Sequence, residues 1–263
     1  MKENKQGLSR RDFLRTLPFY AGAAGSLLLP QRVVEAQTGN YPEVITRFET
    51  TLPFYALTID DGWSTGALLS MRTFLKENNM KATFFLIGEA VGYCEYNSPG
   101  IIRSLVEDGH TLGYHAMESR DEQGYTGADV NWWRRDYHNY VNYLTNDILG
   151  PELAGICLKK YARAPSMIFT DDLLHMYELE GLQPYGCSKT MRMLRDRGET
   201  VERGDIVLFH VTDSDFTYMQ NGLLANTESL SETSLGCLEG SGACPPVEKP
   251  AGGFFEKDIK NFR

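Results

Sequence analysis

The sequence predicts an α/β fold with parallel strands. Short apolar runs alternate along the chain with segments whose apolar residues recur at helical spacing, and a strand–helix–strand order makes consecutive strands parallel. The 263 residues suffice for one large α/β domain or two small ones, and a hydrophobic content of 42% is enough for a packed core. We find no internal repeat or low-complexity tract that points to another architecture.

Residues 1–36 are expected to be an export signal and not part of the fold. The twin-arginine pattern Ser9–Leu14 precedes the short apolar stretch Leu17–Leu29, and Val34–Ala36 offers a small-residue cleavage site. We therefore expect the twin-arginine export machinery to deliver the chain to the periplasm or beyond. Residues 37–50 are interpreted as a linker, and no apolar run reaches the roughly 18 residues of a membrane-spanning helix.

The charge of the chain limits its partners. Removing residues 1–36 takes away six Lys and Arg but only three Asp and Glu, so the formal charge falls from −9 to −12. This acidity argues against nucleic acid and anionic membrane surfaces as partners.

The cysteines show neither zinc nor redox spacing, because no Cys-x-x-Cys is present. In an oxidising compartment Cys237 and Cys244 are the expected disulfide pair. Cys157 and Cys187 lie in apolar surroundings and are expected to be small buried side chains.

The first half of the domain is predicted to be strand, helix, strand, helix, strand. The helices are expected after Ser64 or Thr65, ending at Asn78-Asn79, and at residues 99–108. The strands are expected at Phe54–Ile59, at Lys81–Leu86 before Gly88, and at Thr111–Tyr114.

The second half continues this rhythm. Asp129 is expected to cap a longer helix with His138 on its exposed side. Its predicted core stripe is Val130, Trp133, Tyr137, Val141, Leu144 and Ile148. The elements expected next are a strand at 158–163, a helix at 170–179, a strand at 182–188 and the strand Asp205–Phe209. Periodicity fades from Thr212, so the domain is assigned to residues 51–212 and a Gly/Ser/Pro-rich extension to 213–263.

Asp60 and Asp61 form an acidic doublet at the end of the first predicted strand. Successive side chains of a strand point to opposite faces, so both can reach one site only where the strand turns, and Gly62 permits a turn. Two neighbouring anions favour a cation beside them, and a metal held by one Asp would leave the other available as a base. The alternative is an ordinary turn before a helix.

Three further groups stand at or just beyond the ends of other predicted strands, namely His115, Arg163 and His210. Each has a structural explanation when taken alone: a satisfied core histidine, a surface ion pair, and a hydrogen-bond donor at a strand end. Loops at the carboxyl edge of a parallel sheet converge on one mouth, so together these groups indicate an active site.

The spacing of these groups resembles the NodB-type polysaccharide deacetylases of carbohydrate esterase family 4. Thr58–Gly62 resembles the first motif of that family, Gly109–His115 the approach to its second, Arg163–Pro165 its third, and Ile206–His210 its fifth. The resemblance spans roughly residues 55–211.

The resemblance implies a distorted (β/α) barrel of about seven parallel strands that removes N-acetyl groups from an amino-sugar glycan with a divalent metal, usually zinc. By this likeness Asp61 and His115 are metal ligands, and Asp60, paired with Arg163, is the general base on a metal-bound water. His210 is implied to be the general acid, and the backbone N–H of Ser166 to face the oxyanion. Such a metal would acidify its water and polarise the amide carbonyl.

The sequence departs from the family pattern at the second metal histidine, where Ser119 stands. Because a serine hydroxyl is a poor zinc ligand, an oxygen-rich set would shift preference toward manganese or magnesium. Glu118, Asp121 or Glu122 could compensate from the same loop. The fourth motif, an Asp and a Trp that support the acid, has no clear match between residues 185 and 204, and Ser166 replaces an aromatic residue.

These departures leave two other functions open beside an exported metal-dependent hydrolase of an amino-sugar polysaccharide or oligosaccharide. One is an inactive barrel that binds glycan or assists an envelope complex. The other is a metal-independent amidohydrolase acting on a small amide.

Overall fold

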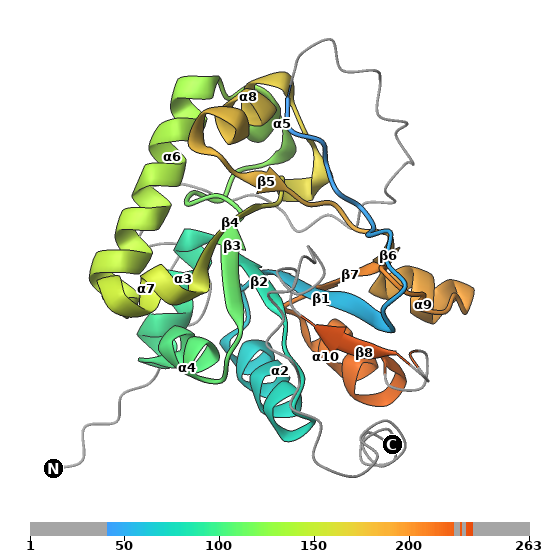
Figure 1. Ribbon diagram of the computed structural model, residues 1–263. Coiled ribbons are helices and arrows are strands. Elements are labelled where there is room, and N and C mark those ends of the chain that lie inside the picture. Colours follow the sequence, from blue (N-terminus) through green and yellow to red (C-terminus); the bar gives the residue numbers. More distant parts are fainter. Residues whose placement is uncertain (1–40, 224–226, 228–229, 234–263) are drawn as a thin grey trace, which may run out of the picture.

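The computed structural model describes residues 41–223, 227 and 230–233. Their centre is a curled, all-parallel sheet in the order β5-β4-β3-β2-β1-β7-β6, with β8 also paired to β1 (Figure 1). The strands are β1 (Phe54–Asp61), β2 (Thr83–Leu86), β3 (Thr111–Tyr114), β4 (Leu158–Ala162), β5 (Gln183–Pro184), β6 (Lys189–Thr190), β7 (Ile206–His210) and β8 (Ser231–Thr233). The expected distorted barrel of about seven parallel strands is confirmed.

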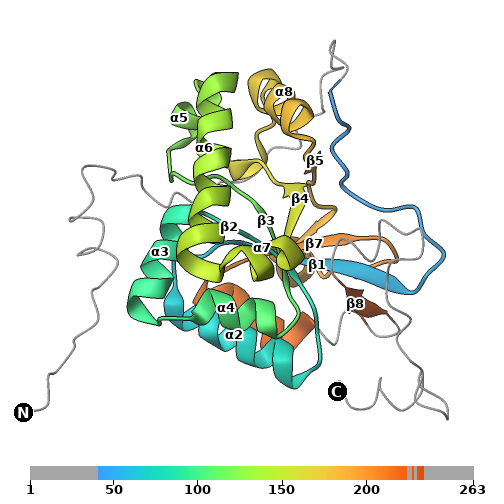
Figure 2. The ribbon, with the colours of Figure 1, turned by 60° about the vertical axis from the view of Figure 1, so that its left-hand side comes forward.

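Helices cover the outer face of this sheet (Figure 2). They are α2 (Thr65–Glu77), α3 (Gly88–Asn97), α4 (Ile101–Glu107), α5 (Glu122–Thr126), α6 (Val130–Tyr143), α7 (Pro151–Cys157), α8 (Asp171–Glu180), α9 (Met191–Arg197) and α10 (Asp213–Tyr218). A π-helical turn, η1 (Leu144–Leu149), extends α6, a 3-10 turn, η2 (Pro165–Met167), follows β4, and a π-helical turn, η3 (Met219–Leu223), follows α10. Among the described residues no helix is long and apolar enough to cross a membrane.

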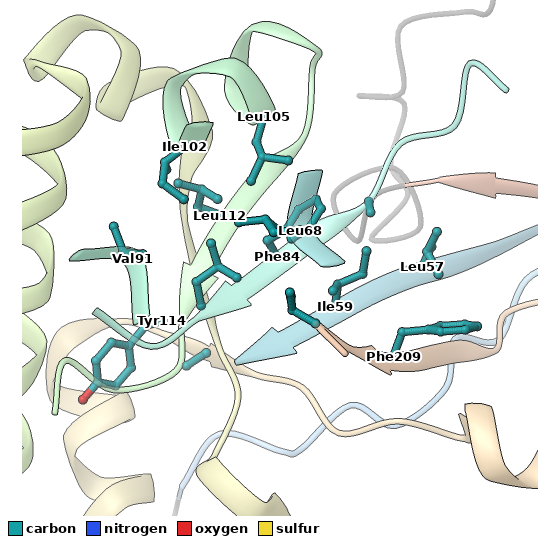
Figure 3. Close-up of a cluster of buried hydrophobic side chains, with 14 of the residues drawn as sticks. Leu57, Ile59, Leu68, Phe84, Val91, Ile102, Leu105, Leu112, Tyr114 and Phe209 are labelled. Atoms are coloured by element: carbon teal, nitrogen blue, oxygen red, sulfur yellow. The ribbon is translucent and has the colours of Figure 1, made fainter. Parts of the chain in front are cut away.

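The main core lies between the helices and the outer face of the sheet. Because side chains alternate along a strand, Leu57 and Ile59 of β1 point outward together with Phe84 of β2 and Phe209 of β7 (Figure 3). They pack against helix residues that include Leu68, Val91, Ile102 and Leu105 (Figure 3).

The opposite, inner face carries a much smaller apolar cluster, Ala56, Phe85, Tyr185 and Ile206. The alternation that buries Leu57 and Ile59 outside therefore turns Thr58 and Asp60 inward, and both are buried. Polar residues inside the curl need internal partners, and the site below supplies them.

Segment 41–50 contacts the chain next to β5 and next to β7. Ile45 pairs with Tyr185 after β5, and Arg47 pairs with Asp205 before β7. The Gly186 backbone N–H also donates to the Ile45 carbonyl at 2.9 Å. This segment therefore links the β5 edge of the sheet to the start of β7.

Most predicted elements are present, including the helix capped by Asp129 with His138 exposed. The prediction of one strand at 182–188 was wrong, because the segment 185–188 separates two short strands, β5 and β6. Helix α3 was not predicted, since Gly88 was interpreted only as the end of β2. Helix α10 and strand β8 likewise follow Thr212, where only a polar tail was expected.

Cys94 and Cys157 are buried free thiols, and Cys187 is a partly exposed one. The expected pair Cys237 and Cys244 and the signal in residues 1–36 lie outside the described residues.

Candidate functional site at the carboxyl edge of the sheet

Asp60 and Arg163 form a buried ion pair inside the curl. Arg163 follows β4, is 0% exposed, and donates from Nη1 to Asp60 Oδ1 at 2.8 Å. The same Nη1 lies 2.8 Å from Thr58 Oγ1, while Nη2 and Nε donate to the carbonyls of Gly186 and Tyr185 at 2.8 and 3.3 Å. The guanidinium stacks on the Phe85 ring, 4.5 Å from its centroid. Arg163 is thus held by several partners. Asp60 Oδ2, the oxygen that Arg163 does not contact, lies 3.8 Å from His115 Nε2 at the carboxyl edge of the sheet, which we call the mouth.

Asp61 turns toward the same mouth because β1 ends on it. Its φ of 75° and the φ of 109° at Gly62 interrupt the strand alternation that would otherwise send its carboxylate away from Asp60. The side chain of Asp61 is 38% exposed, against 4% for Asp60. One carboxylate is therefore buried with a cation while its neighbour is more exposed, and the turn at the strand end lets both approach His115.

His115 lies opposite this doublet. It follows β3, is 3% exposed, and its Nδ1 is 2.9 Å from the Arg163 carbonyl. The other nitrogen, Nε2, consequently points at Asp61 Oδ1, 3.5 Å away, and at Asp60 Oδ2, 3.8 Å away. Burial lowers the pKa of His115, but the charges of Asp60 and Asp61 outweigh it and raise the pKa above its ordinary value.

The pair Asp61 and His115 fits one edge of a metal coordination shell. Zinc bonds of about 2.0–2.2 Å at a tetrahedral angle separate two ligand atoms by about 3.4 Å. The observed 3.5 Å between Asp61 Oδ1 and His115 Nε2 matches this spacing. The described residues nevertheless contain no group of three or more His, Cys, Asp or Glu that could hold a metal ion. By the family resemblance, the third ligand would come from position 119, where this chain has Ser119.

The loop that carries Ser119 is held by two carboxylates that the sequence analysis missed. Asp136 on α6 accepts from the backbone N–H groups of Met117 and Glu118 at 2.6 and 3.0 Å, and from the Tyr114 hydroxyl at 2.6 Å. Glu89 on α3 accepts from the Ser119 backbone N–H at 3.1 Å. Asp136 lies between core positions of the predicted helix, and nothing in the local sequence indicates its long-range contacts.

Burial raises the pKa of Asp136 to about 6, although its three hydrogen-bond donors oppose the shift. Burial likewise raises the pKa of Glu89. Two of the acidic residues proposed to compensate for Ser119 have other partners: Glu118 pairs with Arg120 at 3.1 Å, and Asp121 caps α5.

His210 completes the inner rim. It pairs in register with Asp60 on the neighbouring strand, so the two side chains share a face, and its side chain is 45% exposed. Asp215, another residue not foreseen, lies 3.6 Å from His210 Nδ1. Burial lowers the pKa of His210, but the Asp215 carboxylate and the charges of Asp61 and Asp60 raise it to about 9.

Ser166 lies in the exposed turn η2 directly after Arg163-Ala164. Its φ of 54° is left-handed, as are those of Met167 beside it and of Ala116 after His115. Such angles are costly for residues with a side chain and collect where a fold fixes backbone direction. A residue with a side chain and a left-handed φ stands at or after the end of β1, β3 and β4, namely Asp61, Ala116 and Ser166.

The structure thus brings Asp60, Asp61, His115 and Arg163 into direct contact and sets His210 on the adjoining strand. Ser119 and Ser166 lie on loops at the same edge, where the Ser119 backbone N–H donates to Glu89 and Ser166 is exposed. The arrangement offers a buried carboxylate, a cation-binding edge and an imidazole, which are the parts needed for hydrolysis of an amide.

Comparison with known proteins finds a family match over part of the chain. Residues 49–147 match the family model for polysaccharide deacetylase. The chain is 38% identical over 63 residues to the peptidoglycan-N-acetylglucosamine deacetylase PgdA of Listeria monocytogenes, covering 24% of this chain and 13% of that protein. It is 31% identical over 126 residues to a chitooligosaccharide deacetylase of Bradyrhizobium, covering 48% and 52%. The chain therefore spans about half the length, or less, of these two curated relatives.

Solved structures share the fold at low identity. A family 4 carbohydrate esterase from Bacillus anthracis superposes with a TM-score of 0.60 at 19% identity, over 74% of this chain and 86% of that one. Wild-type BA3943, a CE4 family pseudoenzyme from Bacillus anthracis, superposes with a TM-score of 0.61 at 17% identity, over 75% and 69%. The resemblance to the polysaccharide deacetylase family that the motifs predicted is confirmed, by the family model over residues 49–147 and by the fold over most of the chain.

Proposed function

We propose that the protein is an exported hydrolase that removes N-acetyl groups from an amino-sugar glycan, with a divalent metal, zinc by family likeness. The observation that carries the proposal is the convergence of Asp60, Asp61, His115 and Arg163 from three strand ends onto one point. The curated relatives named above act, by their names, on peptidoglycan N-acetylglucosamine and chitooligosaccharides, and both substrates contain N-acetylated amino sugars.

Asp60 is the proposed general base. Arg163 occupies Oδ1, so Oδ2 at the mouth is the oxygen that can take a proton from the attacking water. The water oxygen then bonds to the amide carbon, and the carbonyl oxygen becomes the oxyanion. The backbone N–H of Ser166 is the proposed donor to that oxyanion.

Asp61 and His115 are the proposed metal ligands, with Ser119 at the third position. A divalent cation held there would acidify the water and polarise the amide carbonyl. The Arg163 carbonyl fixes His115 through Nδ1 and leaves Nε2 free to bind the cation. With Ser119 in place of a histidine, this chain should hold zinc weakly, and manganese or magnesium remain alternatives.

His210 is the proposed general acid. The carbon–nitrogen bond breaks as His210 delivers a proton to the nitrogen, so the products are acetate and a free amine. With a pKa of about 9 the imidazole carries this proton at neutral pH. Its nearly half-exposed position lets a bulky glycan reach it.

Acetate release from N-acetylglucosamine oligomers tests the proposal. Asp60→Asn keeps the size of the side chain but removes the base, so kcat should fall by about 10²- to 10⁴-fold. Asp172→Asn, an exposed position on α8, is the matched control and should leave the rate unchanged. A chelator should also abolish release by the wild type. Equal rates for wild type and Asp60→Asn would overturn the assignment of Asp60.

A second candidate is a barrel without turnover that binds glycan. It is favoured by Ser119 and by the absence of a three-ligand metal group among the described residues. One structural relative is itself described as a pseudoenzyme. Metal analysis distinguishes the two: bound metal that Asp61→Ala removes supports the hydrolase, while oligomer binding without metal or acetate release supports the binding protein.

A further inference from the structure

Asp215 is a buried carboxylate that the chemistry above does not use. It lies in the first turn of α10, five residues after His210, and is 5% exposed. Thr212, the residue that caps α10, accepts from the Asp215 backbone N–H at 3.1 Å and donates from its hydroxyl to Asp215 Oδ1 at 2.8 Å. The Ser214 hydroxyl lies 3.3 Å from the same oxygen. These contacts leave the carboxylate little freedom to move.

The other oxygen of this carboxylate faces His210. Asp215 Oδ2 accepts from the His210 backbone N–H at 2.8 Å and lies 3.6 Å from the ring nitrogen Nδ1. One oxygen therefore contacts both the main chain and the imidazole of His210. A 3.6 Å separation is longer than a hydrogen bond, but contacts of catalytic groups often shorten only when substrate binds.

Helix capping explains only part of this arrangement. In a capping box the acidic side chain returns to the backbone N–H of the cap residue itself. Here it reaches past Thr212 to His210. Asp213 already supplies an exposed negative charge to the first turn of α10, where it favours the helix dipole. The burial and direction of Asp215 are thus specific to His210.

We infer that Asp215 is the positioning residue of His210, and this inference rests on the proposed function. It holds the imidazole with Nδ1 toward the carboxylate, so that Nε2 is the nitrogen left to face the substrate and deliver the proton. His210 must be protonated before the carbon–nitrogen bond breaks, and the negative charge of Asp215 stabilises this imidazolium form. The supporting Asp that has no match between residues 185 and 204 is thus supplied from the other end of β7.

The charges that face His210 are Asp60 and Asp61 from β1 and Asp215 from α10. Removing the Asp215 charge leaves the two β1 carboxylates in place. Asp215→Asn should therefore lower the pKa of His210 without abolishing its protonation. A group that must be protonated to act loses activity as the pH rises through its pKa, so the alkaline limb of the pH–rate profile should move to lower pH.

The experiment compares Asp215→Asn with Asp213→Asn, which removes an exposed acid from the same turn. The pKa of His210 is measured by NMR on histidine-labelled protein, with the signal assigned by its loss in His210→Gln. In Asp215→Asn we expect this pKa and the alkaline limb to fall by about one unit and kcat to fall at least about tenfold. Asp213→Asn should match the wild type, and Asp215→Glu should recover part of the loss.

A merely structural role for Asp215 would lower thermal stability but leave the His210 titration and the alkaline limb unchanged, and that result would overturn the inference. The NMR titration does not depend on turnover, so it separates the two proposals. A shifted His210 pKa in a protein that releases no acetate would retain the Asp215–His210 pair but reject the proposed function. An active Asp215→Asn enzyme whose His210 pKa is unshifted would retain the proposed function but reject the role of Asp215.

Discussion

At the scale of single residues, the proposed metal site depends on Ser119, which stands where the family pattern has a histidine. Asp61 Oδ1 and His115 Nε2 already have the spacing of two ligands on one ion. The hydroxyl of Ser119 adds no charge and little affinity for zinc. Under the proposed function, Asp61 and His115 would be two spaced ligands and Ser119 a weak third one.

Replacement of Ser119 by histidine should strengthen this site. The loop already holds residue 119 through the bond from its backbone N–H to Glu89, so a new imidazole need not order the backbone. Even partners outside the ligand shell change metal affinity by about 10- to 100-fold, so a direct ligand should raise zinc affinity by at least about tenfold. Calorimetric titration with zinc alone measures the gain.

The double variant Asp61→Ala with Ser119→His provides the control for this gain. If the new histidine acts with Asp61 and His115, loss of Asp61 should remove most of the added affinity. An unchanged affinity in Ser119→His alone would mean that residue 119 faces away from the pair and that the third position lies elsewhere.

At the scale of elements, the loop after β3 depends on helix α6. Asp136 satisfies two backbone N–H groups of this loop and the Tyr114 hydroxyl, all with one buried carboxylate. His115 and Ser119 flank the backbone that Asp136 anchors, so helix α6 helps to position both residues.

Asp136→Ala should therefore be costly for stability. It leaves three donors without their acceptor, and hydrogen bonds to charged groups contribute about 1.5–3 kcal/mol each before relaxation, so we expect a net loss of about 2–4 kcal/mol. Asp129→Ala on the same helix removes only the cap on Trp132 and should cost about 1 kcal/mol. Urea unfolding measures both, and equal losses would show that water replaces Asp136 in the loop.

The same scale shows what the sequence could predict. The strands β1 and β7 were predictable because each is a short, nearly continuous apolar run. Helix α3 was not, because Gly88 and Gly92 weaken its helical signal and its buried face consists largely of small residues. The break between β5 and β6 was also hidden, since its cause is the pairing of the 185–188 segment with distant strands and carbonyl groups.

Some residues of the candidate site could likewise be predicted from the sequence, and others could not. The sequence indicates Asp60, Asp61, His115, Arg163 and His210 because each stands at or just beyond the end of a strand, and parallel strands end at one edge. The roles of Asp136 and Asp215 could not be predicted, because they depend on which backbone groups outside their own helical turn the carboxylates contact. Glu89 escaped with the unpredicted helix that carries it.

At the scale of the whole molecule, Arg163 joins parts of the sheet that are distant in sequence. Its side chain contacts β1 through Thr58 and Asp60 and the segment after β5 through two carbonyl groups, while its own carbonyl orients His115. One buried cation, Arg163, therefore helps to hold both the curl of the sheet and the positions of Asp60 and His115.

Arg163→Met tests this link. The substitution keeps apolar contact with Phe85 but leaves the Asp60 carboxylate buried without its cation, and breaking a buried pair in this way costs about 3–5 kcal/mol. Asp60→Asn removes the charge that Arg163 was bound to, so the double variant should be more stable than the sum of the two single losses by about 1–3 kcal/mol. Urea unfolding of the four proteins gives this coupling directly. Strictly additive losses would mean that the two carbonyl groups and Thr58, and not Asp60, satisfy the guanidinium, and that the base is held at the mouth by β1 alone.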